Sequence, residues 1–325
     1  MKIIHPGDPE RLEGGIKTSM RHQRQCLRKQ EIEYTEKYDP GADILHVNML
    51  SPGDIYRVMR AKKDGIPVVI HTHEIGENFA GSFRFSTYLA PFARRYVDAF
   101  YRCADLLICP SEYAAEVLDE RGIDTEKKVI SNGIDPERFR DLEDFGFEKE
   151  GFTVINVSIV FERKGLTDFI DTGRELPDTE FRWFGPNFGR WMTGGSTEKK
   201  IKNSPENVDF PGYADDVRDA FASGDVFFFP TKSETEGLSV LEAAYCGLPI
   251  VVRDIPVYES IFTDEKDCLK AEDVEGFARS IERLKEDSKL RERIADNAKA
   301  LAEQHTLDRI AEKLENAYNF AVKNR

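Results

Sequence analysis

The chain has 325 residues, of which 40% are hydrophobic and 33% charged, and its formal net charge is −14. Such acidity argues against a nucleic-acid partner, and no apolar run approaches the length of a transmembrane helix. The length predicts two domains of roughly 150 residues each.

Cysteine usage and charge distribution indicate the cellular compartment and the kind of surface that the protein can face. Five cysteines without a CxxC pair favour a reducing cytoplasm and give no sign of a metal site, and the apolar run at the start is too short for a signal peptide. Residues 1–102 hold 16 basic and 13 acidic side chains. The remaining residues hold 30 of the 46 basic side chains and 47 of the 60 acidic ones. A locally basic first half can face an anionic surface.

The first half alternates short apolar runs with helical patterns. Strands are predicted for KIIH (2–5), ILHV (44–47), PVVIHTH (67–73), DLLICPS (105–111) and KKVIS (127–131). Helices are predicted for about 16–30, 54–63, a stretch ending near 102, and 112–121. Continuous apolar strands separated by helices indicate a parallel sheet covered on both faces.

The alternation stops at residues 132–152, which are rich in charge and turn residues and are interpreted as an interdomain linker. It then resumes with strands at TVINVS (153–158), EFRWFG (180–185), NVDFPG (207–212), DVFFFP (225–230) and LPIVV (248–252). Helices are predicted from residue 164, near 215–223, after residue 237, and through the remainder. Ligands of such sheets bind beyond the carboxyl ends of the strands, so the cleft between two such domains is the expected site.

The run TKSETEGLSVLEA (231–243) places two glutamates, Glu234 and Glu242, around Gly237, directly after the strand DVFFFP. We predict a loop that carries Glu234 and a helix whose first turn carries Glu242. Carboxylates beyond a strand end indicate a ligand site. The alternative is a capped, solvated helix start.

This stretch belongs to a wider resemblance. SETEGLSVLEAAYCGLPIVV resembles the nucleotide-sugar signature of retaining glycosyltransferases of the GT-B fold, in the large family 4 (glycosyl transferases group 1). Three more blocks follow in the family's order: PVVIHTHE, CADLLICPSEYAAEVLDERGIDTEKKVISNGIDPERF and VSIVFERKGLTDFI. A single E-x7-E spacing would be weak evidence, but four ordered blocks are specific.

The resemblance implies an α/β protein of the GT-B class, with two doubly wound Rossmann-like domains facing across a cleft. An acceptor-binding domain is expected over 1–145 and a nucleotide-sugar-binding domain over 146–305. A C-terminal helix over 306–325 is expected to pack back toward the first domain.

The resemblance also implies a role for each residue of the carboxylate stretch. Glu242 accepts hydrogen bonds from the ribose hydroxyls and Glu234 faces the hexose, since a carboxylate is an acceptor-only group. Backbone N–H groups of Gly237, Leu238 and Ser239, at a helix start, meet phosphate or sugar oxygens.

Cations for the diphosphate are expected in FERKG (161–165). Lys164 matches the family's lysine before a glycine, and by resemblance it is a catalytic and donor-binding residue. The family's Gly-Arg upstream is replaced here by Ser158 and Ile159. Arg163 either substitutes for the missing arginine or is a solvated helix-start residue.

In the first half, His73 matches a family histidine near the donor hexose and the acceptor, and it is the third candidate catalytic residue. His71 is expected to point the other way along the strand, as a core histidine. Gly15, with Gly14 before it, precedes the first predicted helix and matches a glycine loop beside the diphosphate. A plain turn is the alternative.

The function implied is transfer of a hexose, with UDP-glucose or UDP-galactose as the expected donor, to a hydroxyl acceptor with retention of configuration. No cofactor or metal ion is expected besides the nucleotide sugar. Two alternatives stay open, a soluble sugar acceptor and a catalytically decayed nucleotide-sugar-binding protein. A dinucleotide-dependent oxidoreductase is disfavoured, because no G-x-G-x-x-G follows the first strand.

The acceptor hypothesis rests on aromatic and basic residues within 79–102 and on the basic helix at 17–29. Aromatic side chains beside cations suit anionic lipid headgroups. The run from His73 to Glu77, followed by Gly81 and Ser82, is similar to bacterial glycolipid glucosyl- and galactosyltransferases. We therefore expect a lipid or lipid-linked sugar acceptor and a cytoplasmic protein, attached peripherally to the inner face of the cell membrane.

Overall fold

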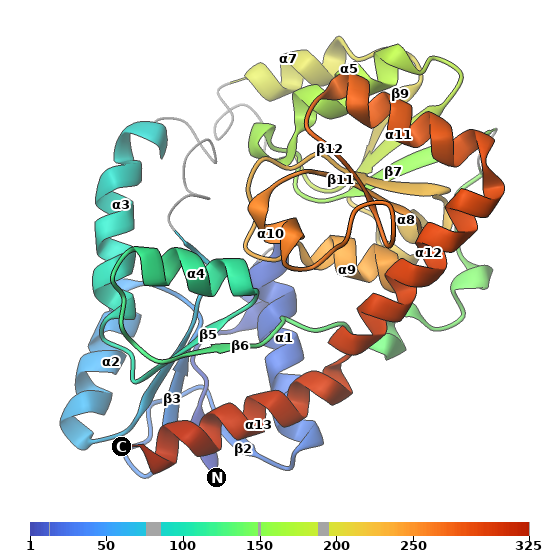
Figure 1. Cartoon of the computed structure of the whole chain (residues 1–325). Helices are drawn as coiled ribbons and strands as arrows, with labels where there is room; N and C mark the ends of the chain where they lie inside the picture. The colour runs from blue at the N-terminus through green and yellow to red at the C-terminus, as the bar shows by residue number, and fades with distance from the viewer. Residues whose placement is uncertain (13, 76–85, 149–150, 188–194, 325) are drawn as a thin grey trace. The chain divides into compact units, whose positions relative to one another are not determined.

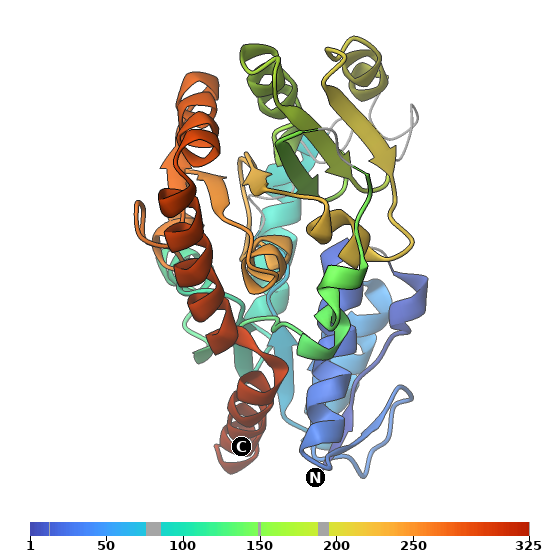
Figure 2. The same ribbon diagram turned by 90° about the vertical axis from the view of Figure 1, so that its right-hand side faces the viewer.

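The computed structural model describes residues 1–12, 14–75, 86–148, 151–187 and 195–324, with the backbone alone for 86–90. The chain divides into two compact units. Unit 1 comprises Met1–Phe79, Tyr88–Asp135 and His305–Arg325, and unit 2 comprises Ala80–Thr87 and Pro136–Gln304. Figures 1 and 2 show that unit 1 holds both the first strand and the last helix of the chain.

Unit 1 is built on a six-stranded parallel sheet in the order β2-β1-β3-β4-β5-β6. Its strands are β1 (Lys2–Ile4), β2 (Glu33–Thr35), β3 (Ile44–Val47), β4 (Val68–His71), β5 (Leu106–Cys109) and β6 (Lys127–Val129). Its helices are α1 (Gly14–Lys29), α2 (Pro52–Asp64), α3 (Ser86–Tyr101), α4 (Glu112–Glu120) and α13 (Leu307–Lys323). A short 3₁₀ turn, η1 (Pro9–Arg11), precedes α1.

Successive strand residues of unit 1 face opposite layers of helices, which is why its central strands β3, β4 and β5 are buried and largely apolar. Leu45 and Ile70 pack in a core with side chains of α2, α3 and α4. Ile44 and Val69 pack in a second core with side chains of α1 and α13. Helices therefore cover both faces of the sheet (Figure 1).

Unit 2 is built on a second six-stranded parallel sheet, in the order β12-β11-β10-β7-β8-β9. Its strands are β7 (Thr153–Val157), β8 (Glu180–Phe184), β9 (Val208–Gly212), β10 (Val226–Phe229), β11 (Ile250–Arg253) and β12 (Leu269–Ala271). Its α-helices are α5 (Leu166–Glu175), α7 (Ser196–Lys202), α8 (Val217–Ala222), α9 (Leu238–Tyr245), α10 (Pro256–Glu259), α11 (Val274–Glu286) and α12 (Ser288–Ala302). Its 3₁₀ turns are η3 (Pro136–Phe139), η4 (Leu142–Asp144), η5 (Glu162–Lys164) and η6, which runs over Glu303–His305 into unit 1.

An aromatic core fills one face of the second sheet. Phe169 of α5 contacts Phe181, Trp183 and Phe228 edge-on or stacked, with ring centroids 5.0–5.7 Å apart. Such pairs add to the free energy gained by burying large apolar side chains. Side chains of α11 complete this core.

Most of the predicted elements are present, with differences at the sheet edges, in the expected linker and at α7, which was not predicted. The edge strands β2 and β12 were not predicted, because each has only three residues and a partly exposed pattern. The expected linker contains the turns η3 and η4, and Pro136 already belongs to unit 2. Within the described ranges, no helix has both the length and the apolar composition needed to cross a lipid bilayer.

Candidate active site

The order of strands in unit 2 marks one place on its sheet for a ligand. The neighbours β10 and β7 run parallel, yet they are not consecutive in the chain, so the strand order reverses direction between them. Open parallel sheets bind their ligands beyond the carboxyl ends of the strands at such a switch point. The loops that follow β7 and β10 carry the candidate residues Lys164 and Glu234.

These two loops form a buried ionic cluster. The Lys164 ammonium donates a hydrogen bond to Oε1 of Glu234, and Thr231 Oγ1 donates to the same oxygen at 2.9 Å. Arg163 Nη1 lies 3.7 Å from this oxygen and donates to the Ser233 carbonyl at 2.7 Å. The side chains of Arg163, Lys164 and Glu234 are only 17%, 15% and 11% exposed, so Arg163 is not a solvated residue.

Burial and charge act on the pKa values of this cluster in different directions. Burial is the largest influence on Lys164 and lowers the pKa of its ammonium, with Arg163 adding to the effect. Burial also acts most strongly on Glu234 and would raise its pKa, but Lys164 and Arg163 outweigh it, so the pKa is lowered. Glu234 is thus held as a carboxylate beside two cations.

Gly165 explains how the lysine loop comes so close to β10. Its φ of +87° is favourable for glycine alone, and a Cβ at this position would lie 2.3 Å from the carbonyl oxygen of Pro230. The glycine therefore lets the backbone after Lys164 touch the chain that leaves β10.

The start of α9 provides backbone donors on the same side of the sheet. Gly237, with φ of +90°, is the N-cap residue of the helix and has no side chain to cap the N–H groups of the first turn, where Leu238 and Ser239 lie. A Cβ on Gly237 would lie 2.6 Å from the hydroxyl of the buried Tyr258. Exposed N–H groups at a helix start are suited to binding anions.

Glu242 lies in the second turn of α9, not in the first as predicted, and its side chain is 7% exposed. Arg138 of η3 donates a hydrogen bond to its Oε1 at 2.7 Å. Burial raises the pKa of Glu242, and the nearby Arg138 opposes this shift. Sequence reasoning missed Arg138, which is 104 positions away along the chain.

Ser158 and Ile159, which occupy the family's Gly-Arg positions, supply no cation. Ser158 Oγ donates to Asn156 Oδ1 at 2.8 Å, and its carbonyl accepts from the indole of Trp183 at 2.9 Å. In the described part of unit 2, Arg163 is the arginine that lies beside the Lys164–Glu234 pair.

The other predicted residues, His73 and Gly15, belong to unit 1. His73 follows the end of β4, and its Nε2 lies within hydrogen-bond distance of Asn48 Oδ1, 2.8 Å away. Its ring stacks on His71 with centroids 4.4 Å apart. The expectation that His71 points the opposite way was wrong, since residues two apart on an extended chain share a face.

Gly14 and Gly15 are the first two residues of α1 rather than a loop before it. Gly14 has a φ of +68°, and a Cβ on Gly15 would meet no heavy atom within 4 Å. Among the described residues, none therefore fills the space at Gly15.

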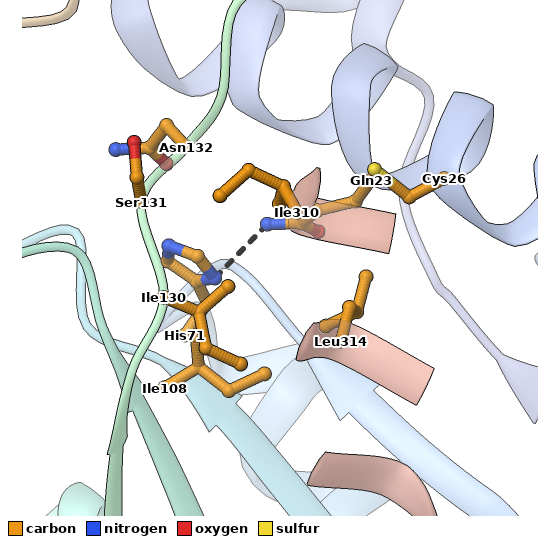
Figure 3. A pocket seen from close by; sticks show the side chains of 9 residues that line it. All are labelled: Gln23, Cys26, His71, Ile108, Ile130, Ser131, Asn132, Ile310 and Leu314. Atoms are coloured by element: carbon orange, nitrogen blue, oxygen red, sulfur yellow. Dashed lines mark hydrogen bonds between the residues drawn. The ribbon is translucent and has the colours of Figure 1, made fainter. Parts of the chain in front are cut away.

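A cavity of about 10 Å³ lies beside His71 in unit 1 (Figure 3). Its lining is mainly apolar, from Cys26, Ile108, Ile130, Ile310 and Leu314, with Gln23, His71, Ser131 and Asn132 as the polar members. Such a volume holds about one water molecule, so this cavity is not a substrate pocket.

Comparison with solved structures identifies the class of protein. The chain superposes on an Anabaena protein, HepE, in complex with UDP-glucose, with a TM-score of 0.74 and 19% identity over 98% of this chain and 99% of that one. Sucrose-phosphate synthase from Thermosynechococcus elongatus gives a TM-score of 0.74 at 17% identity, over 95% and 79% of the chains. Two parallel six-stranded sheets with interleaved helices define the GT-B glycosyltransferase fold, as predicted.

Sequence comparison identifies the family. The model for glycosyl transferases group 1 matches residues 137–301, and that for glycosyltransferase family 4 matches residues 8–138. The chain is 32% identical to the processive diacylglycerol alpha-glucosyltransferase of Acholeplasma laidlawii over 95% of its length and 94% of the relative's. It is 30% identical to the alpha-galactosylglucosyldiacylglycerol synthase of Streptococcus pneumoniae over 72% and 66%. The chain belongs to this glycosyltransferase family, and it is an enzyme of that kind.

Proposed function

We propose that this enzyme transfers glucose or galactose from a UDP-sugar to the hydroxyl of a membrane glycolipid or diacylglycerol, with retention of anomeric configuration. The observation that carries the proposal is the pair of buried carboxylates, Glu234 and Glu242, each matched to a cation near the carboxyl ends of β7 and β10. The names of the two relatives support the lipid acceptor and the sugar.

Each part of a nucleotide sugar finds a matching group in unit 2. Glu242 accepts from the ribose hydroxyls, while Lys164 and Arg163 stabilise the charge that grows on the departing diphosphate. Glu234 accepts from hexose hydroxyls, and the N–H groups that start α9 meet phosphate or sugar oxygens. We assign His73 and Gly15 of unit 1 to the transferred sugar and to the diphosphate.

In this mechanism the departing phosphate takes the proton of the incoming hydroxyl on the same face of the sugar. The protein contributes positioning and electrostatic stabilisation, and no side chain forms a covalent bond with the sugar. We propose that the transfer needs no metal ion, because Lys164 and Arg163 supply the positive charge.

Replacing Glu242 by glutamine is expected to weaken UDP binding about 10- to 100-fold, since hydrogen bonds to a charged group contribute roughly 1.5–3 kcal/mol each. The effect on turnover at saturating donor is smaller, because ribose contacts act in the ground and transition states alike. Calorimetric titration with UDP measures the change, and Glu259→Gln, an exposed glutamate of unit 2, is the control.

The pH dependence provides a second measurement on the same variant. Burial raises the pKa of Glu242. As the pH is lowered, the unmodified enzyme is therefore expected to lose UDP affinity at a higher pH than it would with a carboxylate of ordinary pKa. The glutamine variant should lose this dependence. Unchanged affinity in Glu242→Gln at neutral pH would contradict the ribose assignment.

The surface proposed for the lipid differs from the one expected from the sequence. Of the five cations on α1, four lie beside carboxylates: Lys17 and Arg21 beside Glu10, Arg24 beside Glu36, and Lys29 beside Asp308. Arg24 is also buried. The helix thus carries the five cations expected from the sequence, but most of their charge is matched by nearby carboxylates. Phe79, Phe83, Phe85 and Arg84 of the other predicted segment, with Glu77, Gly81 and Ser82, lie outside the described residues, and so does the side chain of Tyr88.

Exposed aromatic and aliphatic side chains occur instead on α2 and on the described part of α3. Tyr56 and Met59 of α2 are 64% and 69% exposed, and Phe92 and Tyr96 of α3 are 69% and 41% exposed. The Tyr96 hydroxyl donates to the carbonyl of Leu50, just before α2, at 2.6 Å. This contact joins the two helices in one α2–α3 surface.

Cations accompany these side chains. The exposed basic residues of the α2–α3 surface are Arg60, Lys62, Lys63, Arg94 and Arg95. Arg60 lies beside Asp64 and Lys62 beside Asp105, as four cations of α1 lie beside carboxylates. Apolar side chains among lysines and arginines match a bilayer interface with anionic headgroups. We propose that the α2–α3 surface attaches the enzyme to the inner face of the membrane.

Flotation with vesicles tests this attachment. We expect the full chain to float with vesicles that contain phosphatidylglycerol at low salt, and to float less with phosphatidylcholine alone or at high salt. The triple variant Tyr56→Ser, Met59→Ser, Phe92→Ser should lose most of the bound fraction. Tyr213→Ser, which removes a 75% exposed tyrosine of unit 2, is the control. Equal recovery with both lipids, together with full activity on a soluble sugar acceptor, would favour a soluble-acceptor enzyme.

A further inference from the structure

Four of the chain's six histidines lie together in unit 1, near the carboxyl ends of three adjacent strands. His5 follows β1, His46 is in β3, His71 ends β4 and His73 follows it. The rings of His46 and His71 stack at 6.0 Å and those of His71 and His73 at 4.4 Å. Two buried amides, Gln23 of α1 and Asn48 after β3, lie among these rings.

Gln23 and Asn48 bind each other reciprocally and are named here the amide pair. Gln23 Nε2 donates to Asn48 Oδ1 at 2.9 Å, and Asn48 Nδ2 donates to Gln23 Oε1 at 2.8 Å. Each amide also contacts histidine. His73 Nε2 lies 2.8 Å from Asn48 Oδ1, and His5 Nε2 lies 2.7 Å from Gln23 Oε1.

The reciprocal bonds couple the orientations of the two amides, because turning one would set like groups against each other. Ser19 selects between the two coupled orientations. Its hydroxyl donates to Asn132 Oδ1, so it can only accept from Gln23, whose Nε2 lies 3.2 Å away. The same Nε2 also lies 3.1 Å from His71 Nδ1, a contact that Figure 3 shows as a dashed line, so its two hydrogens face three acceptors.

We propose that the amide pair is a positioning element for His73, which it holds as the tautomer protonated at Nε2. An amide oxygen only accepts, so the nitrogen bound to Asn48 must carry the proton, and Nδ1 keeps the lone pair. His73 then accepts a hydrogen bond from a substrate hydroxyl at Nδ1 and does not donate one. This inference rests on the proposed role of His73 in hexose transfer.

The surroundings of the ring favour its neutral form. Burial lowers the pKa of His73 to about 3, with the nearby His5 adding to the effect, although part of the ring surface stays exposed. The pKa of His5 is also lowered by burial, to about 4, and that of His71 lies well below its usual value. Asn48 and Gln23, which contact this group from the end of β3 and from α1, carry no charge, and Arg24 of α1 disfavours protonation of His5.

Nitrogen-15 NMR of the full chain, labelled at histidine, tests the tautomer without substrate. We expect His73, assigned by comparison with His73→Gln, to show a protonated Nε2 and an unprotonated Nδ1 from pH 6 to 8. A ring protonated at Nδ1, at both nitrogens, or in rapid exchange between tautomers would overturn the proposal.

Kinetic variants test the consequence for transfer. Asn48→Leu removes the acceptor, and we expect kcat to fall about tenfold or more while KM for the donor changes less than twofold or so. Asn48→Asp keeps an acceptor for Nε2–H and should retain more of the turnover. Equal losses in both variants would overturn the positioning role, and the NMR result on the unmodified chain stands even if either variant fails to fold.

Thr72→Val is the matched control. The Thr72 hydroxyl is buried and donates to the Ile108 carbonyl at 3.1 Å, so the variant removes one buried hydrogen bond near β4 without touching the amide pair. It should leave both the tautomer and kcat nearly unchanged. If no UDP-sugar binds, the proposed function fails, yet the spectra still decide the tautomer.

Discussion

Lys164→Ala is expected to lower the turnover of hexose transfer about a hundredfold or more, because a preorganised cation on the leaving phosphate acts mainly in the transition state. KM for the UDP-sugar should rise less than kcat falls. Steady-state assays of UDP release with both concentrations varied measure the two effects. Lys232→Ala is the control, since Lys232 is also near carboxylates, Glu162 and Asp168 at 3.6 and 3.4 Å, but is 46% exposed.

The same substitution should also reduce stability, since it removes the nearer of the two cations that the described residues place beside the buried Glu234. Breaking a buried ion pair costs about 3 kcal/mol or more. Turnover must therefore be compared at a temperature at which each variant is folded. A Lys164→Ala enzyme with turnover within about threefold of the unmodified chain would remove Lys164 from the transition state.

Gly165→Ala should disrupt the site through the backbone. Its positive φ costs about 1–2 kcal/mol for a residue with a Cβ, and the contact with the Pro230 carbonyl adds strain that no side-chain rotation relieves. We expect a loss of about 3 kcal/mol in the stability of unit 2. We also expect nearly complete loss of transfer, because relief of the clash must move Lys164 away from Glu234.

Gly247→Ala measures the cost of a positive φ without a steric clash. Gly247 has a φ of +81°, and among the described residues no heavy atom lies within 4 Å of an added Cβ. This variant should lose only about 1 kcal/mol and keep its activity. Both tryptophans of the chain belong to unit 2, so urea unfolding followed by tryptophan fluorescence reports on that unit. Equal midpoints for the two variants would show that the contact with Pro230 is unimportant.

Patterns within a short stretch of chain were enough to predict most of the fold. Each central strand is an apolar run between helical patterns, and burial on both faces requires that composition. Glu234 was found because it follows such a run, and Lys164 because it matches the family's lysine before a glycine. The strand order, which places β7 beside β10, has no signature in the local sequence.

What the sequence did not predict depends on contacts between distant segments. Arg138 reaches Glu242, and Gln23 reaches Asn48, without any periodic spacing between them. One feature of the sequence could have indicated Asn48: it directly follows the predicted strand ILHV. His73 lies at a similar place, two residues after the end of β4. The pairing of the α1 cations was not predictable either, because their carboxylate partners, such as Glu36 and Asp308, lie elsewhere in the chain.

The most direct test of the account is a transfer assay with the purified full chain, UDP-glucose or UDP-galactose, and anionic vesicles that contain diacylglycerol or a glucosylated diacylglycerol. We predict UDP release that depends on the lipid acceptor, proceeds in the presence of EDTA, and yields a glycolipid whose proton NMR coupling shows an α-linked sugar. No transfer from any nucleotide sugar, or a β-linked product, would contradict the account.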